Sequence, residues 1–160
     1  MASVSPVKMA AGLLAAVLIL TGTAIPTRAA VDDQTRQALI AAINDEYHTR
    51  ALYQAVIVRF GEVRPFANIV RAEEQHIAEL TALFAAYGIP VPPDTAAGKV
   101  QAPASIGEAC RVAAQAEIQN AALYDRLQKT VKEPDIIAVF SRLRDASIKA
   151  HLPAFQRCAR

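Results

Sequence analysis

The sequence predicts an all-α fold, a four-helix bundle in which two antiparallel hairpins are joined by a long crossover. Three observations support this prediction. Apolar residues recur at steps of three and four through four long segments, which is the period of an amphipathic helix. Prolines, glycines and a capping pattern stand at the ends of these segments, where helices begin and end. A proline-rich stretch of 16 residues separates the first two segments from the last two.

The first hairpin is expected to consist of helices from about Asp33 to Phe60 and from Pro65 to Tyr87. Gly61 and Gly88 follow their last turns, where glycine is a common helix stop. Pro65 is tolerated in a first turn because its missing N–H would have no partner within the helix. The connection between the helices is short, so we expect them to be antiparallel.

The second hairpin is expected to begin at the capping box Ser105-Ile-Gly-Glu108, and its first helix to continue to about Val131. Pro134 opens the last helix, which extends to about Arg157. The crossover, residues 89–104, reaches about 50 Å when extended, more than the roughly 35 Å length of the second helix. The second and third helices can therefore run parallel.

The two hairpins resemble each other in sequence. Glu46-Tyr-His-Thr-Arg-Ala-Leu-Tyr53 matches Glu117-Ile-Gln-Asn-Ala-Ala-Leu-Tyr124 at an offset of 71 residues, since each begins with Glu and ends in Ala-Leu-Tyr. Beyond the hairpin turn, His76-Ile-Ala-Glu-Leu matches His151-Leu-Pro-Ala-Phe at an offset of 75. Duplication of one helical hairpin explains both matches.

Each helix brings acidic or imidazole side chains to its inward face at about the same level. Glu73 and His76, for example, share one face because residues three apart are neighbours on a helix. Burying several carboxylates together costs several kcal/mol for each charge unless a cation compensates them. The donor types suit one or two iron ions, with manganese or zinc also possible. The candidate metal ligands are Glu46, Glu73, His76, Glu117 and His151.

A purely structural ion-pair network is the alternative to a metal site, because Arg50 and Arg144 also fall on the inferred inward faces. We prefer the metal site because its acids and imidazoles recur at matching levels of a duplicated hairpin. His48 lies about 200° round the helix from Glu46 and is expected to face outward. The side chains expected around the ligands are Tyr53, Tyr124, Arg50, Arg144 and Ser147.

Two cysteines are expected to meet at one end of the last hairpin. Glu117 and His151 should lie level in an antiparallel pair, and Cys110 precedes the first by seven residues while Cys158 follows the second by seven. Seven residues make almost two helical turns, so both sulfurs return to the facing sides. A disulfide is favoured over two reduced cysteines, because the chain begins like an exported protein.

Residues 1–29 have the layout of a secretory signal peptide, with Lys8 before the apolar run Met9–Leu20 and small residues around Arg28. Cleavage is expected after Ala29, which leaves residues 30–160 as one bundle domain in the periplasm or outside the cell. That part carries 15 basic and 15 acidic residues. Such a balance argues against nucleic acid or an anionic membrane as a partner. Alanine-rich helices leave self-association into a homo-oligomer open.

Several motifs carry a family resemblance: Val63-Arg-Pro-Phe-Ala-Asn-Ile69, Glu73-Glu-Gln-His76, Tyr87-Gly-Ile-Pro-Val-Pro92, Asp135-Ile-Ile137, and Ala146-Ser147 followed by His151-Leu-Pro-Ala-Phe155. Through these motifs the chain resembles the ferritin-like superfamily, and within it an exported bacterial branch of unknown function with rubrerythrin-like helices. In di-iron members of the superfamily the first and third helices each supply a Glu, and the second and fourth each supply Glu-x-x-His. The resemblance therefore implies the five ligands named above.

The chain departs from the di-iron pattern in its last helix, where Ile148 stands in place of the expected Glu and Ser147 is a poor substitute. An asymmetric di-metal site, a mononuclear site and a vestigial site all remain open. The resemblance implies a metal-binding protein and, by analogy, an iron-dependent oxidoreductase acting on oxygen or peroxide. A metal carrier or sensor without catalysis, and a structural or interaction bundle, are the alternatives, so whether the protein is an enzyme stays open.

Overall fold

The structure, a computed structural model, describes residues 29–160. The expected signal peptide comprises residues 1–29, and all of it except Ala29 lies outside the described residues. The described part contains only helices and connections, as the sequence predicts. The helices are α1 (Asp33–Phe60), α2 (Phe66–Ala86), α3 (Ile106–Leu127), α4 (Pro134–Ala146), the π-helix η1 (Ser147–His151) and α5 (Leu152–Cys158).

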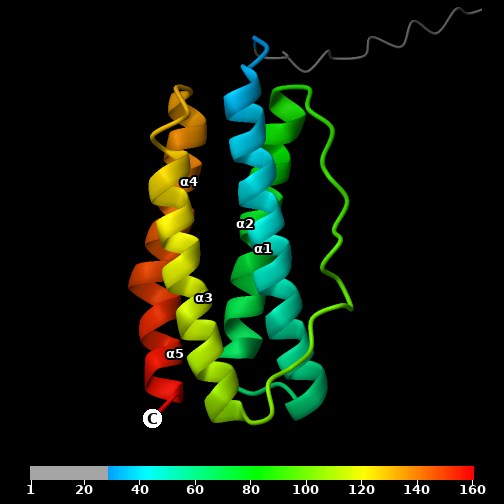
Figure 1. Cartoon of the computed structure of the whole chain (residues 1–160), viewed down its shortest axis with the longest axis vertical. Coiled ribbons are helices and arrows are strands. Elements are labelled where there is room, and N and C mark those ends of the chain that lie inside the picture. The colour runs from blue at the N-terminus through cyan, green and yellow to red at the C-terminus, as the bar shows by residue number, and fades with distance from the viewer. Residues whose placement is uncertain (1–28) are drawn as a thin grey trace, which may run out of the picture.

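The four long rods form a bundle of two antiparallel hairpins, as Figure 1 shows. Helices α1 and α2 make the first hairpin, and α3 with the rod formed by α4, η1 and α5 makes the second. The crossover runs down the whole length of the bundle, so α2 and α3 point in the same direction (Figure 1). None of the described helices is both long enough and apolar enough to cross a membrane.

Side-chain hydrogen bonds explain where α1 and α3 begin. The Asp32 carboxylate accepts from the N–H of Thr35 at 2.8 Å, which satisfies a donor at the start of α1 that has no helical partner. At the start of α3 the Ser105 hydroxyl accepts from the N–H of Glu108, and the Glu108 carboxylate accepts from the N–H of Ala104. This reciprocal pair confirms that the sequence carries a capping motif here.

The last helix is not continuous, contrary to the expectation of one helix from Pro134 to about Arg157. The π-helix η1 interrupts it, and the N–H of Leu152 donates to the carbonyl of Ser147, five residues back. Pro153 gives the physical reason. Proline has no N–H to donate and its ring clashes with the carbonyl four residues earlier in a regular helix. A widened turn before Pro153 avoids that clash and rotates Ser147 towards the core, where it is 2% exposed.

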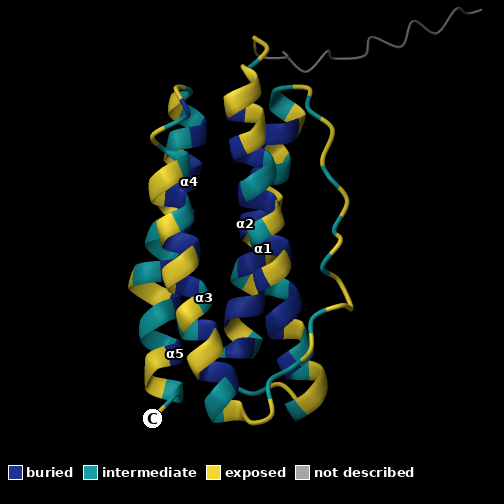
Figure 2. Cartoon of the chain, in the orientation of Figure 1, coloured by how far each residue is buried: buried dark blue, intermediate teal, exposed yellow. Residues whose placement is uncertain are grey.

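The core consists of two apolar clusters with a polar layer between them. One cluster contains residues before Glu46 on α1 and after His76 on α2, with Tyr124 and Phe140. The other contains residues after Glu46 and before Glu73, with Phe155. Figure 2 shows the buried faces turned towards the interior of the bundle. The acidic and histidine side chains therefore lie at the junction of two apolar halves, shielded at both ends.

The crossover is fastened to α1 by polar contacts. The guanidinium of Arg50 pairs with the carboxylate of Asp94. Asp94 also accepts from the N–H groups of Ala96 and Ala97, so it organises the turn in which it stands. The long proline-rich connection thus has a fixed path along the bundle.

A disulfide joins Cys110 on α3 to Cys158 at the end of α5, with 5.7 Å between the Cα atoms. The predicted pairing is therefore confirmed. The bond ties the end of the last rod to the start of α3, on the side of the core that holds Phe155. It fixes the segment that immediately follows His151.

Candidate metal centre

The five residues predicted as ligands converge in the polar layer, and each is more than nine-tenths buried. They form two overlapping groups whose ligand atoms lie within 4.8 Å of one another. The first group is Glu46, Glu73 and His76, and the second is Glu73, Glu117 and His151. Glu73 belongs to both groups. These buried groups could each hold a metal ion.

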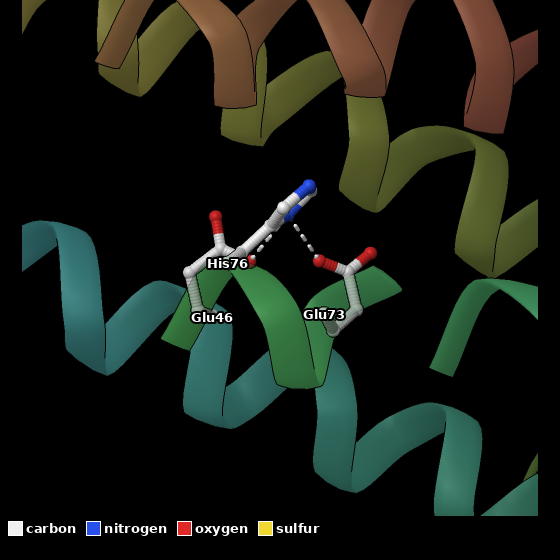
Figure 3. Close-up of side chains that lie close together, drawn as sticks. All are labelled: Glu46, Glu73 and His76. Carbon is white, nitrogen blue, oxygen red and sulfur yellow. Dashed lines mark hydrogen bonds and ion pairs between the residues drawn. The ribbon is translucent and has the colours of Figure 1, made fainter. Parts of the chain in front are cut away.

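The first group is drawn in Figure 3, where the His76 ring lies between the two carboxylates. Its Nδ1 atom is 2.9 Å from Oε2 of Glu73 and 3.3 Å from Oε2 of Glu46. Glu73 and His76 lie one turn apart on α2, as their spacing predicts, whereas Glu46 comes from the neighbouring α1. All three residues of this group therefore come from the first hairpin.

The second group joins the two hairpins. The Nδ1 atom of His151 is 3.2 Å from Oε1 of Glu73 and 3.4 Å from Oε1 of Glu117. Neither this nitrogen nor Oε1 of Glu73 has a hydrogen-bond partner, although both atoms are buried. The two histidine rings lie nearly parallel, with 5.6 Å between their centroids. Glu73 thus presents one oxygen to each histidine.

Two buried tyrosines hold the outer carboxylates. The hydroxyl of Tyr124 donates to Oε1 of Glu46 at 2.6 Å, and the hydroxyl of Tyr53 donates to Oε1 of Glu117 at the same distance. Burial and nearby carboxylates raise the pKa of both phenols well above the usual value. Both tyrosines therefore stay protonated and act as hydrogen-bond donors, close to the ligands as the sequence analysis expects.

Asn120 is a site residue that the sequence analysis missed. Its Nδ2 atom lies 2.7 Å from Oδ2 of Asp45 and 3.3 Å from Oε1 of Glu46. Its Oδ1 atom accepts a 2.7 Å hydrogen bond from the hydroxyl of Ser147. The signal was its spacing, because Asn120 lies three residues after Glu117 and so shares the inward face of α3. Ser147, placed inward by η1, contacts this amide.

Electrostatics favour protonated histidines in the metal-free protein. Burial lowers the pKa of His76, but the carboxylates of Glu46 and Glu73 outweigh it and raise the pKa to about 10. Burial also lowers the pKa of His151, and the carboxylates of Glu117 and Glu73 raise it to about 9. At neutral pH each imidazole therefore carries a charge that offsets the buried acids.

The carboxyl groups of Glu46 and Glu73 respond to the site in opposite ways. Burial and the charge of Glu73 raise the pKa of Glu46 to about 7. Burial also raises the pKa of Glu73, but its contacts with His151 and His76 outweigh that effect, so the net pKa is lowered. Glu73 is therefore ionised more readily than Glu46, because its carboxylate lies between two imidazolium rings.

The two arginines considered as neutralising partners lie outside the cluster. Arg50 pairs with Asp94 of the crossover. Arg144 pairs with Asp125 at 2.7 Å and with its neighbour Asp145 at 3.3 Å, near the surface. Neither guanidinium neutralises the buried carboxylates, so the arginine ion-pair network considered as the alternative to a metal site is absent from the described part of the chain.

Comparison with known proteins identifies the fold. The chain is similar to the crystal structure of a hypothetical protein from Methanococcus jannaschii DSM 2661, with a TM-score of 0.73 and 21% sequence identity. The likeness covers 86% of this chain and 85% of that one. The two chains share a fold. No family model and no curated protein matches the sequence, so function has to be argued from the site.

Proposed function

We propose that this protein is an exported, ferritin-like metal-binding protein that holds one or two iron ions in the core of its bundle. The observation that carries the proposal is a pair of buried atoms, Oε1 of Glu73 and Nδ1 of His151, that lack hydrogen-bond partners. An unsatisfied buried polar group costs about 1–3 kcal/mol. A cation that contacts both atoms would remove that cost and would compensate the buried carboxylates.

The chemistry of the donors supports iron. Three carboxylates and two imidazoles, without a thiolate, suit iron, and manganese or zinc accepts the same donors. Ferritin-like di-iron bundles take a Glu from each of two helices and Glu-x-x-His from the others. Glu46, Glu117 and the pair on α2 follow that distribution. The last rod supplies His151 without a Glu, and Ser147 fills the inward position of the preceding turn.

The preferred activity is oxidation–reduction with a small oxidant such as oxygen or peroxide. Bound iron would supply the one-electron chemistry. Burial of all five ligands leaves access only to small molecules. Tyr53 and Tyr124 orient the outer carboxylates through their hydrogen bonds. A carrier or sensor that binds metal without turnover is the second candidate.

Export rests on the sequence pattern of residues 1–29. The disulfide between Cys110 and Cys158 supports it, because disulfides form and persist in oxidising compartments. Detection of the processed chain in the periplasm or medium of the producing cell, with a new N-terminus at Ala30, tests this part. A chain that keeps its first 29 residues in the cytoplasm would contradict it.

The metal proposal is tested by measuring metal per chain after purification under iron-replete conditions. Glu73→Ala and His76→Ala should lower the metal content, whereas the matched change at the exposed neighbour, Glu74→Ala, should not. If none of the three changes alters the metal content, the metal proposal is wrong and the interpretation as a structural bundle stands. If metal is bound, oxygen consumption with ferrous iron separates the oxidoreductase from the carrier.

A further inference from the structure

The two oxygens of Glu73 have different surroundings. Oε2 is hydrogen-bonded to Nδ1 of His76 at 2.9 Å. Oε1 is buried without a hydrogen-bond partner, 3.2 Å from Nδ1 of His151. The single carboxylate shared by both groups is therefore hydrogen-bonded to one histidine and only charge-paired with the other.

The group around His76 is internally complete. Its imidazole contacts the carboxylates of Glu73 and Glu46, and both contacts have hydrogen-bond geometry. A metal ion that binds here has to take the place of those two hydrogen bonds. Part of its binding free energy is therefore spent on separating partners that already satisfy one another.

The group around His151 is held by charge attraction rather than by hydrogen bonds of good geometry. Its imidazole lies 3.2 and 3.4 Å from oxygens of Glu73 and Glu117, outside hydrogen-bond geometry for the nitrogen. Ligand atoms roughly 2.1 Å from one ion lie about 3.0–3.4 Å from each other, so these separations already suit a shared cation. The hydrogen bond from Tyr53 to Glu117 can remain when the ion binds.

The carboxylates of Glu46 and Glu117 also differ in how many hydrogen bonds hold them. Glu46 accepts hydrogen bonds from Tyr124 and from Asn120, whose amide Ser147 holds in place. The residue that corresponds to Asn120 in the first hairpin is Thr49, 71 positions earlier. Thr49 is buried but makes no hydrogen bond to Glu117 in the described part of the chain. Glu46 is therefore held by two donors and is less free to turn towards an ion.

We propose that the two metal positions are unequal and fill in order, the position at His151 first and the position at His76 second. This inference rests on the proposed metal-binding function and adds which residues bind more tightly. The difference in affinity is expected to be about tenfold or more, as displacement of two hydrogen bonds implies.

The order is tested by titrating the purified, disulfide-intact protein with Co²⁺, followed by its absorption spectrum and by calorimetry. The variants are His151→Gln and His76→Gln, which keep side-chain size and polarity. His48→Gln, at an exposed histidine of α1, is the matched control. Circular dichroism and thermal melting establish that each variant is folded before its titration is interpreted.

Two binding events are expected for the wild type and for the His48 variant. His151→Gln should abolish the tighter event, and His76→Gln should keep it while losing the weaker one. Loss of the tighter event in the His76 variant, or equal weakening in both, overturns the order while leaving metal binding intact. A wild type that binds no Co²⁺ refutes the proposed function itself. If His151→Gln does not fold, retention or loss of the tighter event in His76→Gln decides the order.

Discussion

The hydroxyl of Tyr53, on α1, donates a 2.6 Å hydrogen bond to Oε1 of Glu117, on α3. Tyr124, its counterpart in the sequence repeat, donates in the same way to Glu46 on α1. Each phenol thus reaches across to the carboxylate of the other hairpin. The duplication seen in the sequence is preserved in the hydrogen bonds that orient the candidate ligands.

Removing the hydroxyl of Tyr53 or of Tyr124 should destabilise the folded protein. Tyr53→Phe and Tyr124→Phe are each expected to lower the free energy of unfolding by about 1.5–3 kcal/mol, because each buried hydrogen bond goes to a carboxylate. Urea denaturation measures the change. The matched control is Tyr47→Phe, whose hydroxyl contacts the carbonyl of Pro92 at a long 3.5 Å and should cost less. Equal losses at all three tyrosines would contradict this account.

Metal affinity should rise with pH. A histidine has to be neutral to bind a metal, and His76 and His151 have pKa values of about 10 and 9 without one. Raising the pH removes the competing proton. Between about pH 6 and 8, metal affinity should therefore increase about tenfold per pH unit for each histidine that has to lose its proton. Competition titrations with a chelator of known affinity measure this. Affinity independent of pH would contradict the assigned protonation.

Stability of the metal-free protein should change in the opposite direction. The folded-state pKa of each histidine is raised above the usual 6.5, so its contribution is fully present below that pH. The contribution is lost as the pH rises through about 9 to 10, where the folded imidazoles lose their protons. Urea midpoints of the metal-free protein should therefore fall between pH 6.5 and 10. A parallel series on His76→Gln should show a smaller fall.

Reduction of the disulfide should destabilise the bundle by about 2–4 kcal/mol. It should also weaken metal binding, because α5 follows His151 directly and Phe155 packs against Tyr53 with 5.0 Å between the ring centroids. The measurement compares thermal melting and metal affinity before and after treatment with a phosphine reductant. The variant Cys110→Ser/Cys158→Ser controls for effects of the reductant on the metal. Unchanged affinity in both would show that the bond acts on stability alone.

Arg144→Ala should leave both stability and metal content nearly unchanged. The guanidinium pairs with exposed Asp125, and such surface pairs contribute about 0–1 kcal/mol. The comparison of interest is with Glu73→Ala, which removes the shared carboxylate. A large loss of stability in the arginine variant would revive the structural ion-pair interpretation.

Helical periodicity and end signals were sufficient to predict the bundle, because local chemistry fixes those features. Asp33 and Phe60 bound the first helix as expected, since Asp32 and Gly61 are strong local signals. The third helix ends at Leu127, earlier than the predicted end near Val131. The prediction is inexact here because no glycine or proline marks the last turn of this helix. The interruption by η1 was missed, although Pro153 was a visible reason for it.

The five ligand-type residues were predicted from their spacing, and they do lie together. The spacing does not predict which side chains form hydrogen bonds or ion pairs with each other. Arg50 lies at an inward position of the predicted stripe, yet it extends to Asp94 of the crossover, which no helical period can indicate. The spacing of Asn120 places it on the inward face of α3, but its partners come from α1 and η1, which no helical period indicates. Contacts between distant segments decide these details.

The two groups of ligands differ in how they use the chain. Glu46, Glu73 and His76 belong to one hairpin, so a cation among them would bind without connecting separate parts of the molecule. A cation among Glu73, Glu117 and His151 would instead connect the hairpins, as a reversible counterpart of a cross-link. Binding at the position of His151 would then add a link between the halves of the duplicated fold, and loss of the ion would remove that link.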